Sequence, residues 1–187
     1  MTGIRAYEDK DRAGVENICI ATAGKRAAEN RLWAETILHI YCRYYITKAK
    51  EFCFVAVDEQ DNPIGYILCA PDRNAYKRDF LRCEVRAIRQ YSFIYSLFAL
   101  GEIISSLPFE RKYPAHLHID LLEGYRHMGI GSALINRLCD KLKKENIRGV
   151  MLSVSATNKN AVSFYIKNGF RFLLRTKIFY VMGRELL

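Results

Sequence analysis

Residues 125–138 read YRHMGIGSALINRL, which places an arginine and two glycines directly before an amphipathic helix. Gly129 and Gly131 let the backbone come close to a ligand, or take a positive φ, without a Cβ clash. The main-chain N–H groups from Gly129 to Ser132 stand at the helix start, where donors have no helical acceptor. With the positive end of the helix dipole and the charge of Arg126, they predict an anion site, of which phosphate is the usual occupant.

Two other phosphate-binding loops do not fit this turn. A Walker A loop needs GxxxxGK[ST], and Gly124 and Gly129 have that spacing, but Ile130 stands in place of the lysine. A dinucleotide fingerprint needs a third small residue, where this chain has Leu134. The strand that follows, VMLSVSA, also ends without the carboxylate that would hold a ribose. The sequence therefore disfavours an ATPase and an NAD enzyme.

A second motif follows the turn after one helix and one strand. The run Arg126–Gly131 has the form [R/Q]xxGxG and resembles the acyl-CoA loop of the GNAT superfamily of N-acyltransferases. NKNAVSFYIKNGF, residues 158–170, resembles the NxxAxxxYxxxGF motif of the same family. It matches at Asn158, Ala161, Tyr165, Gly169 and Phe170.

The resemblance covers most of the chain. IRAYEDKDRAGV is typical of the family's first strand and helix, NPIGYIL of its hairpin and FYVMGREL of its ending, and only residues 73–106 have no family template. AHLHIDLL looks like the subgroup that includes the acetyltransferase-like domains of some O-GlcNAc hydrolases.

The order of apolar patterns predicts an α/β (α+β) fold, in which a central mixed β-sheet carries helices on both faces. The expected strands are 3–8, 52–59, 63–72, 115–122, 148–156, 170–175 and 177–183. The expected helices run from Asp9 or Asp11 to about Ala23, over 30–49, with interruptions over 73–106, and over 131–146 and 160–169. A right-handed crossover makes strands 115–122 and 148–156 parallel neighbours. No linker or repeat appears, so we expect one GNAT-like domain over 1–187, with a helical insert at about 73–106.

The resemblance implies acetyl-CoA as cosubstrate, with CoA as product. Strands 115–122 and 148–156 would then part to admit the pantetheine arm, and the 126–132 turn would hold the pyrophosphate. One departure is Glu123, where many members have proline, and its side chain is expected to point outward. The residues implied to bind the cosubstrate are Leu121 and Leu122 through their backbone, Arg126, His127, Met128, Gly129, Ile130, Gly131, Ser132, Asn158, Asn160, Ala161, Phe164 and Tyr165.

Acyl transfer to an amine needs a base, an oxyanion donor and an acid for the leaving thiolate. The resemblance implies Tyr165 as the acid and a backbone amide near Leu121 and Leu122 as the donor; Tyr165 as a plain core aromatic is the alternative. His118 and Asp120 share one face of their strand by its two-residue period, with His116 beside them. We prefer Asp120 over His118 as base. A metal bound by HxHxD lacks a fourth ligand, and a buried His–Asp pair that only fixes the sheet stays open.

Two further groups of side chains could have either a structural role or a role in the site. The aromatic residues Trp33, Tyr41, Tyr44 and Tyr45 are expected to pack in the core, with a wall of the acceptor site as the alternative. The basic residues Arg137, Lys141, Lys143, Lys144 and Arg148 are expected to form a solvated helix face, and the spacing leaves open whether one of them contacts the 3′-phosphate of CoA.

Composition limits the partners. The 187 residues carry a net charge of +9, from 29 basic and 20 acidic side chains. The sequence has no run of five or more Lys or Arg, so nucleic-acid binding is disfavoured. The N-terminus has no apolar signal core, no apolar stretch is long enough to span a bilayer, and the six scattered cysteines suit buried thiols, so we expect a cytoplasmic protein.

The sequence thus predicts an N-acetyltransferase that transfers an acetyl group directly from acetyl-CoA to a primary amine. The acceptor, a small molecule or a protein, is not indicated, and a monomer or a homodimer is expected. The alternative is a domain of the same fold that binds CoA or a partner without turnover. No metal is expected.

Overall fold

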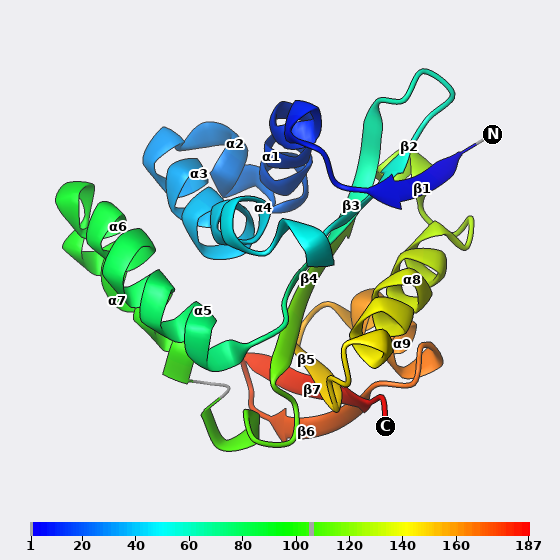
Figure 1. The fold of residues 1–187 in the computed structure, drawn as a ribbon. Coiled ribbons are helices and arrows are strands. Elements are labelled where there is room, and N and C mark those ends of the chain that lie inside the picture. Colours follow the sequence, from blue (N-terminus) through cyan, green and yellow to red (C-terminus); the bar gives the residue numbers. More distant parts are fainter. Residues whose placement is uncertain (1, 105–106) are drawn as a thin grey trace.

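The computed structural model describes residues 2–104 and 107–187, without the side chain of residue 107, and its centre is one seven-stranded sheet (Figure 1). The strand order is β1-β2-β3-β4-β5-β7-β6, and every neighbouring pair is antiparallel except β4 with β5. The strands are β1 Gly3–Ala6, β2 Phe54–Val57, β3 Pro63–Ala70, β4 Ala115–Leu121, β5 Gly149–Ser155, β6 Arg171–Arg175 and β7 Phe179–Glu185. The predicted mixed sheet is confirmed.

Helices cover both faces of this sheet, as Figure 1 shows. One face packs against α8 (Ile130–Lys144) and α9 (Lys159–Lys167). The apolar stripe of α8 is fully buried there, through Leu134, Ile135, Leu138 and Leu142. The other face packs against α1 (Arg12–Thr22), α3 (Arg31–Leu38), α4 (Tyr44–Lys48), α5 (Arg73–Asp79) and α7 (Phe93–Ile104).

β4 and β5 pair only at their beginnings. The parallel register joins Ala115 to Val150 and His116 to Met151, and no further residues of the two strands pair. β4 stays paired with β3 along its length, and β5 with β7, so the sheet opens from His116 onward between two well-formed halves. This is the parting that the resemblance implied.

The helix expected over 30–49 is divided. Asn30 caps α3 by accepting a hydrogen bond from the Trp33 N–H, at 2.9 Å. A π-helical turn, His39–Arg43, then separates α3 from α4. Such a turn takes an extra residue and rotates the side chains that follow it. A short helix, α2 (Lys25–Glu29), precedes this segment.

The segment without a family template is helical and interrupted, as its sequence indicates. Asp72 caps α5, a π-helical turn over Phe80–Glu84 leads into α6 (Val85–Tyr91), and Ser92 ends that helix in an extended conformation before α7 begins. α6 and α7 pack on each other and project from the sheet as a hairpin (Figure 1). Positions 105 and 106 of the expected helical range lie outside the described residues.

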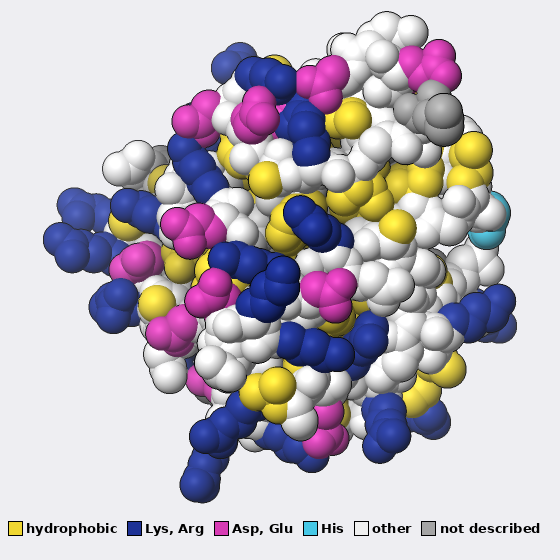
Figure 2. All heavy atoms as spheres, turned by 45° about the vertical axis from the view of Figure 1, so that its right-hand side comes forward, with side chains coloured by type: hydrophobic (Ala, Val, Ile, Leu, Met, Phe, Trp, Pro, Cys, Tyr) yellow, Lys and Arg dark blue, Asp and Glu magenta, His cyan; other side chains and the backbone are white. Residues whose placement is uncertain are grey.

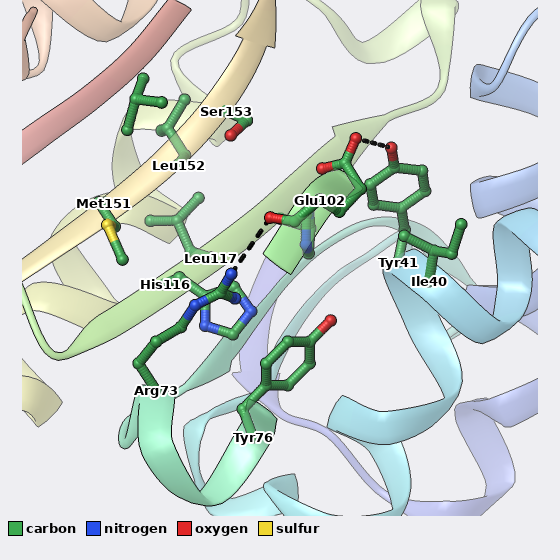
Figure 3. Close-up of a pocket in the computed structure, with 12 residues that line it drawn as sticks. Ile40, Tyr41, Arg73, Tyr76, Glu102, His116, Leu117, Met151, Leu152 and Ser153 are labelled. Atoms are coloured by element: carbon green, nitrogen blue, oxygen red, sulfur yellow. Dashed lines mark hydrogen bonds between the residues drawn. The ribbon is translucent and has the colours of Figure 1, made fainter. Parts of the chain in front are cut away.

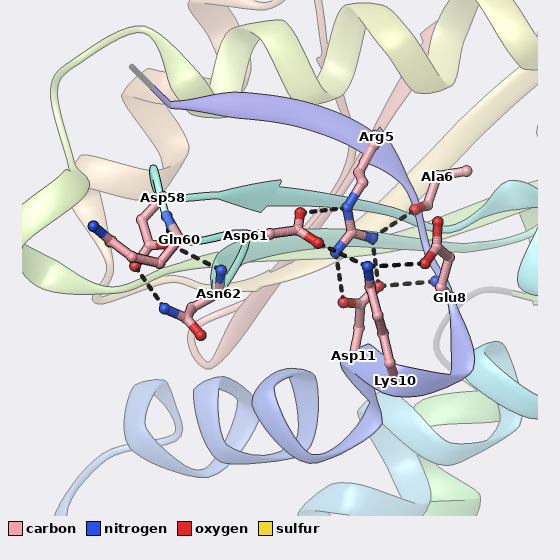
Figure 4. A network of polar contacts seen from close by, with 9 residues as sticks. All are labelled: Arg5, Ala6, Glu8, Lys10, Asp11, Asp58, Gln60, Asp61 and Asn62. Atoms are coloured by element: carbon pink, nitrogen blue, oxygen red, sulfur yellow. Dashed lines mark hydrogen bonds and ion pairs between the residues drawn. The ribbon is translucent and has the colours of Figure 1, made fainter.

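A polar network joins the N-terminal strand to the β2–β3 turn (Figure 4). The Arg5 guanidinium donates to both oxygens of Asp11, at 2.7 and 2.8 Å, and to Asp61 at 2.8 Å. Asp11 is buried, and it also accepts from the Glu8 N–H at 2.8 Å. One guanidinium therefore ties β1, the start of α1 and the hairpin together.

Charges and thiols on the described residues are dispersed. Figure 2 shows Lys and Arg side chains mixed with Asp and Glu over the face that it presents. All six cysteines are free thiols, of which Cys83 alone is exposed. None of the described helices has the length and apolarity to cross a membrane.

Candidate active site

A cavity of about 940 Å³ runs through the opening between β4 and β5. Its walls come from both halves of the sheet, the ends of α1 and α3, the hairpin helix α7, and the first turns of α8 and α9. The described residues that line it are Cys19, Thr22, Ala23, Trp33, Ile37, Tyr41, Phe98, Leu117, His118, Ile119, Asp120, Leu121, Tyr125, Arg126, His127, Gly129, Gly131, Ser132, Ser153, Val154, Ser155, Asn158, Asn160, Ala161, Ser163, Phe164, Tyr165 and Lys167.

One end of the cavity meets the N-terminus of α8. Gly129 caps this helix in the left-handed region, at φ +80°, and its carbonyl accepts the first helical bond from Ala133 at 3.0 Å. The N–H groups of Ile130, Gly131 and Ser132 precede that bond and have no helical acceptor. A Cβ on Gly131 would lie 3.0 Å from the Phe164 ring, so this position needs glycine for a close approach.

Not every residue of the turn contributes a side chain. Met128 is exposed and Ile130 is buried in the core below α8, and neither lines the cavity. Their role in an anion site is limited to the main chain. His127, at φ +66°, does line the cavity, and so does Arg126. Glu123 is exposed and lies outside the lining, in agreement with the expected outward direction.

The opposite wall of this end comes from α9. Asn158 caps α9 by accepting from the Ala161 N–H at 3.1 Å, and Asn160, Ala161 and Phe164 line the cavity beside it. Arg126, His127 and Lys167 are the cationic or titratable basic side chains here, and no carboxylate among the described residues lines this end. An anion is therefore favoured electrostatically.

The basic residues on and after α8 stand apart from the cavity, and contact of one of them with the 3′-phosphate stays a prediction. Arg137, Lys141, Lys143, Lys144 and Arg148 are absent from the cavity lining. Arg137 lies over the Phe54 ring and Lys141 over the Phe52 ring, at 5.5 and 5.2 Å from the ring centres. The structure thus gives no support to one of them as a phosphate ligand.

The main-chain groups of Leu122, for which a role toward the cosubstrate is predicted, take part in bonds within the chain. Its N–H donates to the Ile64 carbonyl and its carbonyl accepts from Tyr125, both at 3.0 Å, so both groups are already bonded within the chain. Main-chain groups alternate in direction along a strand, so Leu121 directs its own toward β5. Arg126 Nε donates to the Leu121 carbonyl at 3.3 Å from that side.

Tyr165 lies on α9 and lines the cavity. The residue is buried, and its ring contacts the rings of Phe164 and Phe170. Burial, and then the nearby charge of Asp120, raise the pKa of Tyr165 well above its ordinary range. The hydroxyl therefore keeps its proton at neutral pH and is a donor.

Asp120 faces the same part of the cavity from β4. The Tyr66 hydroxyl donates to its Oδ2 at 2.7 Å. Burial raises the pKa of Asp120 to about 6, against the opposing effect of the Tyr66 hydrogen bond. A carboxylate with this pKa is ionised at neutral pH and remains basic enough to accept a proton.

His118 lies two residues earlier on the same face, and its basicity differs sharply from that of Asp120. Its Nε2 is 2.9 Å from the Tyr45 hydroxyl, which also forms a hydrogen bond with His116. Burial lowers the pKa of His118 to about 3, so its imidazole is neutral and only weakly basic. Among the described residues, no three His, Cys, Asp or Glu are grouped to hold a metal ion.

The far end of the cavity is aromatic. Of the four aromatic residues considered in the sequence analysis, two line this end and two do not. Trp33 and Tyr41 line the cavity together with Ile37. Tyr44 and Tyr45 instead lie in the buried core, as the packing interpretation expected for all four. Phe98, from α7, lies 5.2 Å from the Trp33 ring and completes this wall.

Sequence reasoning missed Tyr66, Thr22 and Phe98. Tyr66 lies in an apolar strand pattern, and only the pairing of β3 with β4 sets it opposite Asp120. Phe98 belongs to the helical segment for which the family motifs give no template. The one available signal was the apolar excess of residues 91–104, which was larger than a single buried face requires.

Comparisons with known proteins agree with this geometry. The family described as acetyltransferase (GNAT) matches residues 18–170. The crystal structure of SsHAT has a TM-score of 0.87 and 26% identity, covering 100% of this chain and 98% of that one. PaiA N-acetyltransferase from Thermoplasma acidophilum in complex with coenzyme A has a TM-score of 0.62, 17% identity and 99% of each chain covered.

The NatC complex bound to Gag peptide and CoA also shares the fold, with a TM-score of 0.62 and 16% identity over 100% of this chain and 99% of that one. The opened sheet, the glycine turn at α8 and the match over residues 18–170 lead to one conclusion. The chain belongs to the GNAT family of acetyltransferases.

Proposed function

We propose that this chain is an N-acetyltransferase that moves the acetyl group of acetyl-CoA directly to a primary amine. The observation that carries the proposal is the single cavity in which the α8 N-terminus, Tyr165 and Asp120 all take part. The α8 N-terminus suits a pyrophosphate, Tyr165 suits the sulfur of a thioester, and Asp120 suits an amine.

The residues present fit CoA. The free N–H groups at the start of α8 and the side chain of Arg126 suit the pyrophosphate, and Leu121 offers main-chain groups to the amides of the pantetheine arm. Asn158, Asn160, Ala161 and Phe164 form the facing wall. The lack of a Cβ at Gly131 lets the Phe164 ring of the facing wall pack closely against this turn. PaiA and NatC, which share the fold, are structures with CoA.

Asp120 and Tyr165 then each carry out one proton transfer. Asp120 accepts a proton from the amine as its nitrogen attacks the thioester carbonyl carbon. The Leu121 N–H donates to the carbonyl oxygen while negative charge develops there. When the carbon–sulfur bond breaks, Tyr165 donates its proton to the leaving sulfur. The amide and the CoA thiol are the products; Asp120 then releases its proton to solvent and Tyr165 regains one, so no net proton is consumed.

The pKa values favour Asp120 over His118 as the base. Asp120, with a pKa of about 6, is matched to neutral pH, whereas the neutral His118, with a pKa of about 3, is a poor proton acceptor. His118 is better suited to fix the Tyr45 hydroxyl. The non-catalytic alternative shares the cofactor end, but it gives no reason for a carboxylate of raised pKa and a protonated tyrosine to face one cavity.

We further propose that residues 1–187 act as a single domain with the helical insert at 73–106, in the cytoplasm, on a small-molecule or protein amine. On the face that Figure 2 presents, Lys and Arg side chains are mixed with Asp and Glu, which does not favour a nucleic-acid or membrane surface there. The narrower likeness to the domains joined to O-GlcNAc hydrolases and the choice between monomer and homodimer remain predictions.

Acetyl-CoA binding and turnover test this proposal together. Acetyl-CoA at about 100 times its Kd should add about 2.7 kcal/mol of stability and raise the Tm by about 5–10 °C.

Tyr165→Phe should keep that shift but lower kcat by about 100-fold, measured as release of free CoA thiol with an amine panel. Tyr180→Phe, on β7 outside the cavity, is the control. A Tm that does not respond to acetyl-CoA contradicts the proposal, and full turnover by Tyr165→Phe removes its assigned role.

A further inference from the structure

The end of the cavity on the α3 side has an apolar wall. Trp33 and Ile37 of α3 and Tyr41 of the following π-helical turn line it, and each is four residues from the next. They therefore form one stripe along the helical segment, about 12 Å long at about 1.5 Å per residue. Phe98 of α7 lies against Trp33, with 5.2 Å between the ring centres, and completes the wall.

The apolar wall begins beside the proposed base. The Tyr41 ring packs edge-on against His118, with 4.9 Å between the ring centres. Asp120 follows His118 by two residues on β4, so the two side chains share one face of the strand. A group attached to a nitrogen at Asp120 can therefore lie along the wall, from Tyr41 toward Trp33.

Three polar side chains at this end have hydrogen-bond partners within the chain. The Thr22 hydroxyl donates to a main-chain carbonyl of its own helix at 2.8 Å, and His118 Nε2 lies 2.9 Å from the Tyr45 hydroxyl. The Tyr41 hydroxyl donates to Glu102 Oε1 at 3.1 Å, and Figure 3 shows it turned toward that carboxyl group. These contacts leave rings and aliphatic groups as the main surface that the wall offers to an acceptor.

Charge at this end is limited to Asp120. Among the described residues that line the cavity, Asp120 is the only carboxylate, while Arg126 and Lys167 belong to the cofactor end. Glu102 and Arg73 instead line an adjoining recess of about 30 Å³, which has room for a water molecule and not for an acceptor group (Figure 3). Burial raises the pKa of Glu102, which disfavours its ionised form. A second ionised group on the acceptor would therefore lie against the wall without a partner, at a high cost in free energy.

Two further contacts favour a neutral, apolar occupant. Phe98 lines the cavity and is still 42% exposed, so an apolar group that covers it removes hydrocarbon from water. The Arg26 guanidinium lies 4.3 Å from the centre of the Trp33 ring. Its positive charge disfavours a second cationic nitrogen at that end of the wall.

We infer that the acceptor is an amphipathic primary amine, with one amino group at Asp120 and a neutral, apolar body, alkyl or aromatic, against Trp33, Ile37, Tyr41 and Phe98. This inference rests on the proposed function. The same chemistry occurs in free alkylamines and arylalkylamines and at a peptide N-terminus with an apolar first residue.

Six-carbon primary amines with different far ends test the inference: hexylamine, 6-aminohexan-1-ol, 1,6-diaminohexane and 6-aminohexanoate. We expect kcat/KM, measured by thiol release, to be at least about 10-fold higher for hexylamine than for the two charged acceptors. From propylamine to hexylamine it should rise about 3- to 4-fold with each methylene group, because each one takes more hydrocarbon out of water. A diamine or an aminocarboxylate as the best acceptor overturns the inference, and so does a series without dependence on chain length.

Phe98→Ala removes one ring of the wall, and Phe93→Ala is its matched control. Phe93 lies on the same helix, is 58% exposed and does not line the cavity. The ratio of kcat/KM for 2-phenylethylamine to that for ethylamine should fall about 10-fold in Phe98→Ala and keep its wild-type value in Phe93→Ala. Phe98→Glu should reverse the preference between hexylamine and 1,6-diaminohexane. The acetyl-CoA Tm shift checks that each variant is folded, and an unchanged ratio in folded Phe98→Ala overturns the inference.

Two pairs of acceptors distinguish a free amine from a peptide N-terminus. The first pair is 2-phenylethylamine and 1,4-diaminobutane, and the second is the tripeptide amides Phe-Gly-Gly and Lys-Gly-Gly. We expect the apolar member to be preferred, and the pair with the higher kcat/KM identifies the source. Preference for the charged member of that pair overturns the inference.

Fluorescence separates the two proposals, because Trp33 is the single tryptophan of the chain and lies in the wall. Hexylamine titrated into the CoA complex should change its emission at lower concentrations than 1,6-diaminohexane does. This response without thiol release from acetyl-CoA with any acceptor contradicts the enzyme and supports the apolar site. Thiol release with a preference for charged acceptors contradicts the inference and leaves the enzyme in place.

Discussion

Asp120 shows how burial and an opposing hydrogen bond together set the pKa of a side chain. Burial raises its pKa, and the Tyr66 hydroxyl at 2.7 Å opposes that rise by stabilising the ionised form. The sequence predicted that Asp120 and His118 share a face, because strands alternate with a period of two. It did not predict their different basicity, because that depends on neighbours such as Tyr45 and Tyr66, which are distant along the chain.

The pH profile should report this residue. With a pKa of about 6, Asp120 is protonated below pH 6, so kcat/KM should fall as the pH is lowered through that value. Tyr66→Phe removes a hydrogen bond that lowers the pKa of Asp120, so the acid limb should move to higher pH. Stopped assays of thiol release across pH 5–8 measure it, with Tyr113→Phe as the control. An acid limb that stays in place in Tyr66→Phe argues for a different base.

At the scale of elements, α8 was the most predictable. Its apolar spacing and glycine turn predicted both its core face and its anion end, and the observed Ile130–Lys144 is close to the expected 131–146. The π-helical turns at His39–Arg43 and Phe80–Glu84 were not predicted. The local sequence remains compatible with a regular helix, so it carries no signal for these turns.

Gly129→Asp tests the N-terminus of α8. The substitution puts an L side chain at φ +80° and a negative charge beside the free N–H groups, so it should abolish the acetyl-CoA Tm shift. Gly124→Asp adds the same charge in the preceding turn, outside the cavity lining, where an added Cβ meets nothing within 4 Å. It should keep most of the shift. Equal losses in both variants would point to general charge repulsion at this surface.

At the scale of the whole molecule, the sequence predicted the sheet and the order of its elements. The position of the helical hairpin could not be predicted, because residues 73–104 have no family template and their apolar groups serve both the core and the cavity. The network around Arg5 was also missed (Figure 4). It joins residues 5, 11 and 61, which only the folded chain brings together.

That network should make stability depend on acid pH. Burial raises the pKa of Asp11, but hydrogen bonds from Arg5 and the Glu8 amide outweigh it, and the pKa ends below the ordinary 3.8. A depressed pKa gives stability that is present above about pH 4 and lost as the pH falls through the folded value. Asp11→Asn should therefore cost about 2–3 kcal/mol at pH 7, and less at pH 3.

Urea unfolding at the two pH values measures this difference. Lys10→Ala removes an exposed ion pair to Asp61 from the same network, and it should change the midpoint little at either pH. A cost for Asp11→Asn that is the same at pH 3 and pH 7 would show that the charge of Asp11 is not the source.

The short pairing of β4 with β5 has a consequence for the tendency of the protein to aggregate. Beyond His116, two strands in the interior of the sheet present unpaired main-chain donors and acceptors, as outer strands normally do. Such borders recruit any extended polypeptide that reaches them, which is how misassembly and aggregation begin. An acyl-CoA arm bound between the two strands would cover these main-chain groups. Bound acyl-CoA would then lower the tendency of the protein to aggregate, in addition to serving as a substrate.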